Sequence, residues 1–152
     1  LPNDEEKLII GKGKFIKEGK QVALVNFGAR LQECLIAEQN LTKKGIFPTV
    51  FDARFAKPLD ENSLWQIATN HDVIITIEEG SIGGFGSHVN HFLNEKNLLD
   101  KDSKFRSMIL PDLFIDHDKP EKMYKIAGLD SQSIENKVID TLNSKVVLKK
   151  TN

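Results

Sequence analysis

Two stretches of this chain decide its fold: ARFAKPLD at residues 53–60 and EEGSIGGFGS at residues 78–87. Each follows an apolar run that is typical of a buried strand, at residues 49–51 and 73–77, and each leads into a helical pattern. Asp60 is a suitable N-cap for the first of these helices. Strands that alternate with helices predict a mostly parallel sheet covered by helices.

The rest of the chain continues this alternation. We expect further strands at residues 14–16, 22–25 and 108–110, a helix that ends before Gly45, a capping box formed by Asp118 and Glu121, and a last helix over residues 134–142. The predicted fold class is three-layer α/β, with a mostly parallel (mixed) twisted sheet and helices on both faces. Residues 1–20 are expected to form a linker and entry segment, residues 21–143 the domain, and residues 144–152 a basic, disordered tail.

The composition of the chain limits the classes of function that it could have. The 152 residues make one ordinary domain that can bury a substantial core. A formal net charge of −1 argues against nucleic acid as a partner, because nucleic-acid-binding surfaces are strongly basic. No run of about 18 apolar residues occurs, so no membrane partner is expected. The single cysteine, Cys34, excludes an internal disulfide and is expected to be a small core residue.

The glycine-rich stretch at residues 80–86 allows two interpretations. Open α/β sheets bind ligands where a strand leads into a helix, and a helix N-terminus can hold an anion, so a phosphate or nucleotide site is one hypothesis. However, position 89 is Val89, so the full GxGxxG fingerprint is absent, and no GxxxxGK[ST] motif occurs. We favour the second interpretation, in which the glycines allow positive φ or close approach of another backbone.

Charged residues gather at the two predicted strand ends. Glu78 and Glu79 point to opposite faces of an extended strand, so we do not expect a shared proton; one of them would cap the following turn or contact a neighbouring domain. Arg54, Lys57 and Asp60 could clamp a substrate phosphate, because arginine binds phosphate bidentately. We favour an ion pair of Arg54 with Glu78 or Glu79 instead.

The four histidines do not predict a metal site. His88 and His91 stand three residues apart on a predicted helix, yet no third ligand has convincing spacing. His71 and His117 are isolated. We therefore assign no catalytic, cofactor-binding or metal-binding residue.

Four motifs, in this order, resemble the 1-deoxy-D-xylulose-5-phosphate synthase family of the transketolase superfamily. They are RF-x-KPLD at residues 54–60, EEG…GGFGS at 78–87, PD-x-FI-x-H at 111–117 and GLD at 128–130. The resemblance runs from about Gly11 to Leu142 and implies the fold of the superfamily's C-terminal domain. Two positions depart from the family: Asp118 replaces a usual glycine, and Leu113 replaces a frequent basic residue.

The resemblance implies what the parent enzyme does. Members of the family condense pyruvate with glyceraldehyde 3-phosphate, release carbon dioxide and form 1-deoxy-D-xylulose 5-phosphate, which feeds isoprenoid and often thiamine synthesis. They use thiamine diphosphate and magnesium and are homodimers. Their cofactor and substrate residues belong to the first two domains, and their Gly-Asp-Gly magnesium signature has no match here. We therefore expect this chain, taken alone, to be inactive and to bind neither thiamine diphosphate nor magnesium.

The expected role of the domain is packing, against the two N-terminal domains of the same enzyme and across a homodimer. The residues expected at such an interface lie at the strand ends and in the glycine loop: Arg54, Lys57, Glu78, Glu79, Ile82, Gly83, Gly84, Phe85 and Gly86. Among them, Ile82 and Phe85 are expected to form an exposed apolar patch on the isolated chain.

Two alternatives stay open. The chain could be the C-terminal domain of another superfamily member, a transketolase or the β subunit of a 2-oxo acid dehydrogenase. It could also be a free-standing flavodoxin-like module that binds an anion through residues 80–86. The resemblance puts the parent in a bacterial cytoplasm or a plastid-type organelle, and the sequence does not decide between them.

Overall fold

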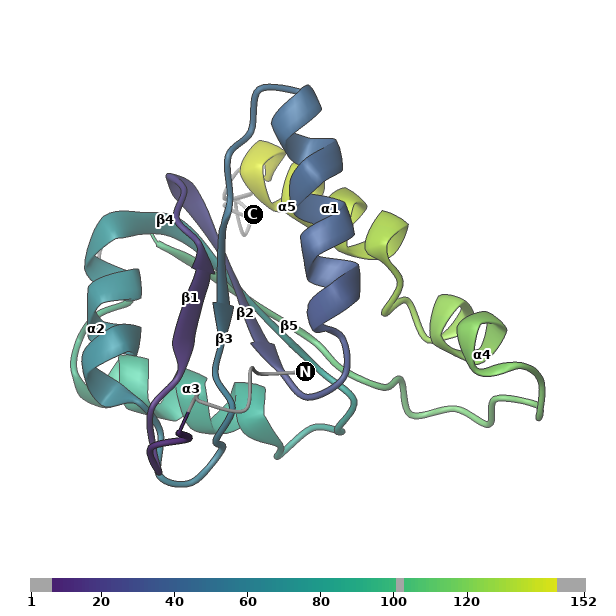
Figure 1. Cartoon of the computed structure of the whole chain (residues 1–152), viewed down its shortest axis with the longest axis horizontal. Coiled ribbons are helices and arrows are strands. Elements are labelled where there is room, and N and C mark those ends of the chain that lie inside the picture. The colour runs from purple at the N-terminus through teal and green to yellow at the C-terminus, as the bar shows by residue number, and fades with distance from the viewer. Residues whose placement is uncertain (1–6, 101–102, 145–152) are drawn as a thin grey trace, which may run out of the picture.

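A computed structural model of the chain describes residues 7–100 and 103–144. Five strands form one sheet in the order β1-β3-β2-β4-β5 (Figure 1). The strands are β1 (Lys14–Lys17), β2 (Gln21–Phe27), β3 (Thr49–Asp52), β4 (His71–Glu78) and β5 (Lys104–Met108). Strand β1 is antiparallel to β3, and the other neighbouring strands are parallel, so the sheet is mixed as predicted.

Helices cover both faces of this sheet. They are α1 (Leu31–Lys43), α2 (Glu61–Asn70), α3 (Phe85–Glu95), α4 (Pro120–Ile126) and α5 (Ser131–Asn143). Helices α1 and α5 pack on one face and α2 and α3 on the other, whereas α4 lies out beyond the end of the sheet (Figure 1). The three-layer α/β prediction is therefore confirmed.

Strand β4 shows why the sheet needs two covered faces. Its side chains alternate, so that Val73, Ile75 and Ile77 face the helices α1 and α5, and Ile74 faces α2 and α3. None of the four is more than 2% exposed. A continuous apolar run is typical of such a central strand, because both of its faces lie in a core.

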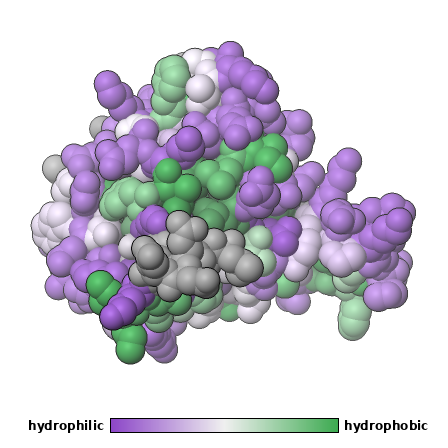
Figure 2. All heavy atoms as spheres, in the orientation of Figure 1, coloured by the Kyte–Doolittle hydropathy of each residue, from purple (hydrophilic) through white to green (hydrophobic). Residues whose placement is uncertain are grey.

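Each face has its own apolar cluster. The cluster under α1 and α5 includes Val22, Leu24, Cys34, Ala37, Leu41, Ile75, Ile134 and Val138. The cluster under α2 and α3 includes Ala23, Val25, Phe51, Leu64, Ile67, Phe85, Val89 and Leu93. In Figure 2, apolar side chains gather beside α1, where this helix packs on the sheet.

Two local expectations are wrong. The last strand was expected at residues 108–110 but runs over Lys104–Met108, because an edge strand tolerates polar side chains and the apolar run marks only its end. The capping box does not form: α4 has Lys119 as its N-cap, without a side-chain cap. The carboxylate of Asp118 instead accepts a hydrogen bond from the Lys119 amide and pairs with Lys122.

Other local expectations hold. The edge strand near residues 14–16 is present as β1, and Gly45 follows α1 with φ of +81°.

His71 is buried, with its ring nitrogens 2.7 Å from the Thr49 hydroxyl and 2.8 Å from the Ile67 carbonyl oxygen. None of the described helices is long and apolar enough to cross a membrane. Of the expected tail at residues 144–152, all but Ser144 lies outside the described residues.

Cys34 has the buried position that its apolar surroundings predict. Its side chain is fully buried on α1, beneath α5. Burial, helped by the nearby Glu33 carboxylate, raises the pKa of the Cys34 thiol from 9.0 to about 12. The reactive thiolate is therefore scarce in the folded protein.

We predict that Cys34 does not react with a disulfide reagent at pH 8 in the native protein and reacts fully once the chain is unfolded. The measurement is the rate of thiol labelling across a urea titration. The rate should follow the unfolded fraction, because only unfolding exposes the thiol. Fast labelling without denaturant would contradict this position for Cys34.

Candidate functional site at the carboxyl edge of the sheet

The topology gathers the candidate residues at the carboxyl ends of the parallel strands. From β2 the chain crosses through α1 to β3, and from β4 it crosses through α3 to β5, on the opposite side of the sheet. The carboxyl ends of β2 and β4 therefore form a topological switch point, where open α/β sheets bind ligands. The segments that meet here are residues 28–30, after β2, and residues 79–84, after β4.

Glu78, the last residue of β4, holds the start of α3. Its Oε2 accepts a hydrogen bond of 2.9 Å from the Phe85 amide, and its Oε1 accepts one of 2.8 Å from the Gly86 amide. These are the first two residues of α3, whose amides have no intrahelical acceptor. Glu78 is only 3% exposed, so its charge is compensated by these amides and by the positive end of the helix dipole. The expectation that one glutamate caps the following turn is confirmed.

Two glycines make room for this carboxylate, and a third makes room for the neighbouring Thr76. A Cβ at Gly80 or at Gly84 would lie 2.5 Å from Glu78 Oε2, and one at Gly86 would lie 2.6 Å from the Thr76 hydroxyl. Gly83 serves a different need, since its φ of +96° favours glycine. Positive φ and close approach thus both occur in the loop, but the approaching group is a carboxylate side chain rather than another backbone.

Glu79 lies on the opposite face, as predicted from its place next to Glu78. Its Oε1 is 2.9 Å from Nε of Arg30, whose guanidinium stacks 3.6 Å above the centre of the Tyr124 ring. A hydrogen bond with the Glu79 carboxylate raises the pKa of Tyr124. This cluster of Arg30, Glu79 and Tyr124 joins the end of β4 to the start of α1 and to α4.

The expected ion pair of Arg54 with Glu78 or Glu79 is wrong. Arg54 follows β3, and β2 lies between β3 and β4, so the two strand ends are about 10 Å apart. The structure brings the Arg54 guanidinium within 3.5 Å of Asp52, the last residue of β3. Arg30, which sequence reasoning missed, takes the place beside Glu79 because β2 is the neighbour of β4.

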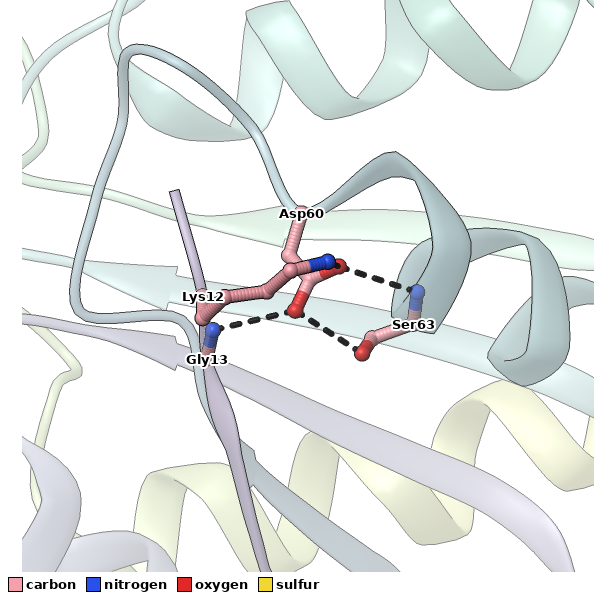
Figure 3. A network of polar contacts seen from close by, with 4 residues as sticks. All are labelled: Lys12, Gly13, Asp60 and Ser63. Carbon is pink, nitrogen blue, oxygen red and sulfur yellow. Dashed lines mark hydrogen bonds and ion pairs between the residues drawn. The ribbon is translucent and has the colours of Figure 1, made fainter. Parts of the chain in front are cut away.

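Asp60 links α2 to the residues that precede β1, residues 7–13, which we call the leading segment (Figure 3). Its Oδ1 accepts a hydrogen bond of 3.3 Å from the Ser63 amide, which confirms it as the N-cap of α2. Its Oδ2 accepts hydrogen bonds from the Gly13 amide at 3.1 Å and the Ser63 hydroxyl at 3.0 Å, and Lys12 Nζ lies 3.4 Å from Oδ1. Sequence reasoning missed Lys12 and Gly13, because no local pattern links them to Asp60.

Arg54, Lys57 and Asp60 do not form a phosphate clamp in this structure. The Asp60 carboxylate is 4% exposed and is occupied by Lys12, Gly13 and Ser63, whereas Lys57 is exposed. The described residues contain no group of three or more His, Cys, Asp or Glu side chains that could hold a metal ion. His88 is half-buried on α3, and His91 is exposed.

Of the two residues expected to form an exposed apolar patch, Ile82 is exposed and Phe85 is buried. Ile82, at the tip of the glycine loop, is 84% exposed. Phe85 is only 2% exposed, because the first turn of α3 directs it into the core, where its ring lies 5.0 Å from that of Phe27. Beside Ile82 lies a pocket of about 420 Å³, lined by Ser81, Ile82, Ile109, Leu110, Pro111 and Asp112. We call it the edge pocket.

The comparisons with known proteins identify the family. Residues 11–134 match the family described as transketolase, C-terminal domain. The chain belongs to this family.

Solved structures agree with the assignment. A split-gene transketolase, described as an inactive beta4 tetramer, is 28% identical, with a TM-score of 0.83 over 92% of this chain and 45% of that chain. A transketolase from Pichia stipitis is 14% identical and has the same fold, with a TM-score of 0.61 over 87% of this chain and 18% of that chain. This transketolase C-terminal domain therefore spans less than half the length of either structure.

We predict that Gly84→Ala lowers the free energy of unfolding by about 1–3 kcal/mol, because the new methyl group would collide with the buried Glu78 carboxylate. In a Glu78→Ala background the same change should cost at least about 1 kcal/mol less, since the collision is gone. Urea unfolding of the four proteins gives the coupling. Ser81→Ala, exposed in the same loop, is the matched control, and an equal cost in both backgrounds would refute the contact.

A second prediction concerns Asp60. Burial raises the pKa of this carboxyl, but the hydrogen bonds from Gly13, Ser63 and Lys12 outweigh burial and hold the pKa below its ordinary 3.8. A lowered folded-state pKa means that the stabilisation is present above the unfolded pKa and is lost as the pH falls through the folded one.

The stability difference between the wild type and Asp60→Asn should therefore be largest above about pH 5 and shrink as the pH is lowered towards about 3. Urea unfolding at each pH measures it. A difference for Asp60→Asn that stays constant with pH would contradict the role of the ionised carboxylate.

Proposed function

We propose that this domain is the C-terminal part of a thiamine-diphosphate-dependent transferase of the 1-deoxy-D-xylulose-5-phosphate synthase type, where it serves packing and assembly. One observation carries the proposal. At the edge of the sheet where a ligand would bind, Glu78 and Glu79 are engaged inside the domain, and three large apolar side chains near it are exposed: Ile82, Leu113 and Phe114.

The carboxyl edge does not fit thiamine diphosphate. Such a site needs a clamp for the diphosphate and its magnesium, and a carboxylate for the pyrimidine ring, which the protein positions and tunes. Here Glu78 is occupied by the α3 amides, Glu79 by Arg30, and Asp60 by the leading segment and α2. An additional ligand would have to displace contacts that hold strands and helices together. We therefore derive no catalytic step through this cofactor.

Three of the four motifs that resemble the synthase family have structural tasks in this domain. Asp60 of the first motif ties the leading segment to α2, and Glu78 of the second caps α3. In the last motif, Leu129 is fully buried and Asp130 caps α5 by accepting a hydrogen bond from the Ser133 amide. These tasks support a packing role for the motifs and leave the chemistry to the rest of the parent.

A transketolase is the second candidate. The 28% identity to a split-gene transketolase supports it, and the family assignment favours both candidates over a flavodoxin-like module. The motif at residues 111–117 supports the synthase. The two reactions differ in one product, because the synthase releases carbon dioxide and a transketolase does not.

The proposed partners are the two N-terminal domains of the same enzyme and a second subunit. The solved relatives extend well beyond the part that this chain matches, which supports further domains in the parent. The description of one relative as a tetramer supports assembly.

The parent protein that contains this chain should form 1-deoxy-D-xylulose 5-phosphate and carbon dioxide from pyruvate and glyceraldehyde 3-phosphate. The measurement is release of labelled carbon dioxide from carboxyl-labelled pyruvate, in the presence of thiamine diphosphate and magnesium. Ketol transfer between sugar phosphates without carbon dioxide would instead assign the parent as a transketolase.

The isolated chain should bind neither thiamine diphosphate nor magnesium, because the carboxylates at its carboxyl edge are already engaged. Titration calorimetry with both ligands together measures this, and the expected result is no heat of specific binding. The parent protein, titrated in the same way, is the positive control. A micromolar affinity of the isolated chain would contradict the assembly role.

A further inference from the structure

We propose that the peptide bond between Phe114 and Ile115 is a cleavage site for an endoprotease that prefers an aromatic side chain before the bond, and that the nicked domain stays folded. The bond lies on the segment between β5 and α5, residues 109–130, which we call the arm. In this cut, water adds across the peptide bond and leaves a carboxylate on Phe114 and an amino group on Ile115. The inference goes beyond the proposed assembly function and does not rest on it.

The arm presents an aromatic side chain that no other part of the described chain covers. Phe114 is 103% exposed, and Leu113 before it is 56% exposed. Residues 109–119 form neither helix nor strand, and α4, which follows, contains no buried residue. In Figure 1 this segment runs away from the sheet and carries α4 beyond the other helices. A protease can therefore reach the segment without opening the core.

Few backbone hydrogen bonds hold the arm in one conformation. Extended peptides are bound through main-chain hydrogen bonds, so a protein segment must first give up its own. In the part of the chain that the structure describes, residues 111–118 make one backbone–backbone hydrogen bond, of 2.9 Å from the Leu113 amide to the Pro111 carbonyl oxygen. A cut at Phe114 therefore needs only local opening, which costs far less than unfolding of the whole domain.

Two other aromatic side chains of the described residues are exposed, and both lie on backbone that is engaged. Trp65 is 48% exposed but lies inside α2, where helical hydrogen bonds hold the backbone. Phe47 is 55% exposed, but its carbonyl oxygen accepts a hydrogen bond of 2.7 Å from the Lys20 amide. The residue after Phe47 is Pro48, which has no amide hydrogen for a protease to bind. Exposure and a loosely held backbone coincide at Phe114.

Packing and polar contacts keep α5 on the domain after the cut. Ile134 and Val138 of α5 are fully buried in the cluster that α5 shares with α1. At the other end of the helix, Lys104 Nζ donates a hydrogen bond of 2.9 Å to the Thr141 carbonyl oxygen. None of these contacts involves the scissile bond, so residues 1–114 and 115–152 should stay together as two fragments of one folded domain.

The cut changes what holds α5 in place. In the intact chain the arm links α5 covalently to the sheet, whereas in the nicked domain α5 is a bound fragment. The stability of the nicked domain then depends on its concentration, because mass action governs the loss of a bound partner. When α5 leaves, the fully buried Val22, Leu24 and Ile75 lose part of their cover. The cut is therefore a suitable first step in removing the domain.

Limited proteolysis with chymotrypsin, followed by mass spectrometry, tests the site. The first products of the wild type should be residues 1–114 and 115–152. The rate of this cut should stay constant as urea is raised towards the unfolding transition, once it is corrected for the effect of urea on cleavage of an unstructured peptide. Local opening rather than global unfolding exposes the bond, so the rate does not follow the unfolded fraction.

Phe114→Ala should slow the first cut at least about tenfold, because the binding pocket of the protease is built for an aromatic ring. Trp65→Ala, at an exposed aromatic residue of α2, is the matched control and should leave the rate unchanged. Both side chains are exposed, so circular dichroism should show folded variants. A first cut at any other bond, a rate unchanged by Phe114→Ala, or a rate that rises with the unfolded fraction would overturn the site.

Size-exclusion chromatography and urea unfolding test the nicked domain. The two fragments should elute together at the size of the intact chain. The urea midpoint of the nicked domain should fall as its concentration is lowered, while that of the intact chain stays constant. Fragments that separate without denaturant, or helical circular dichroism that is lost on cutting, would contradict a folded nicked domain. The carbon dioxide assay on the parent is independent of these results, so the two proposals can fail separately.

Discussion

The carboxylate of Glu78, bound by the first two amides of α3, is the contact on which the carboxyl edge of this domain depends. It joins the end of the central strand to the start of the next helix and fixes the direction in which α3 leaves the sheet. The glycines at 80 and 84 follow from it, because a Cβ at either position would lie 2.5 Å from Glu78 Oε2. The loop that remains holds Ile82 at its tip, 84% exposed.

The same contact explains why a site that often binds ligands serves another purpose here. A helix N-terminus at a topological switch point is suited to an anion, and in this domain the anion is a side chain of the protein. On the other face, Arg30 and Glu79 neutralise each other in the same manner. What the edge offers to a partner is apolar surface, and this is the physical basis for proposing an assembly domain within a larger transferase.

Local patterns predicted most of the helices and strands, although not the bounds of β5 or the cap of α4, and they did not predict the side-chain pairings across the sheet. The run of residues 73–77, the N-cap Asp60 and the stop at Gly45 are signals carried by neighbouring residues, and each was read correctly. The partner of Glu79 depends on strand order, so Arg54 was chosen where Arg30 is correct. The burial of Phe85 depends on the residue at which α3 begins, and the contact of Asp60 with Gly13 joins segments 47 residues apart.

Hydrogen exchange at the amides of Phe85 and Gly86 tests the central claim most directly. The first amides of a helix have no intrahelical acceptor, and at these two positions the Glu78 carboxylate supplies one. The account predicts slow exchange at both amides in the wild type and at least about tenfold faster exchange in Glu78→Ala, while amides within β4 stay protected. Exchange at Phe85 and Gly86 that is fast in the wild type, or unchanged by Glu78→Ala, would contradict it.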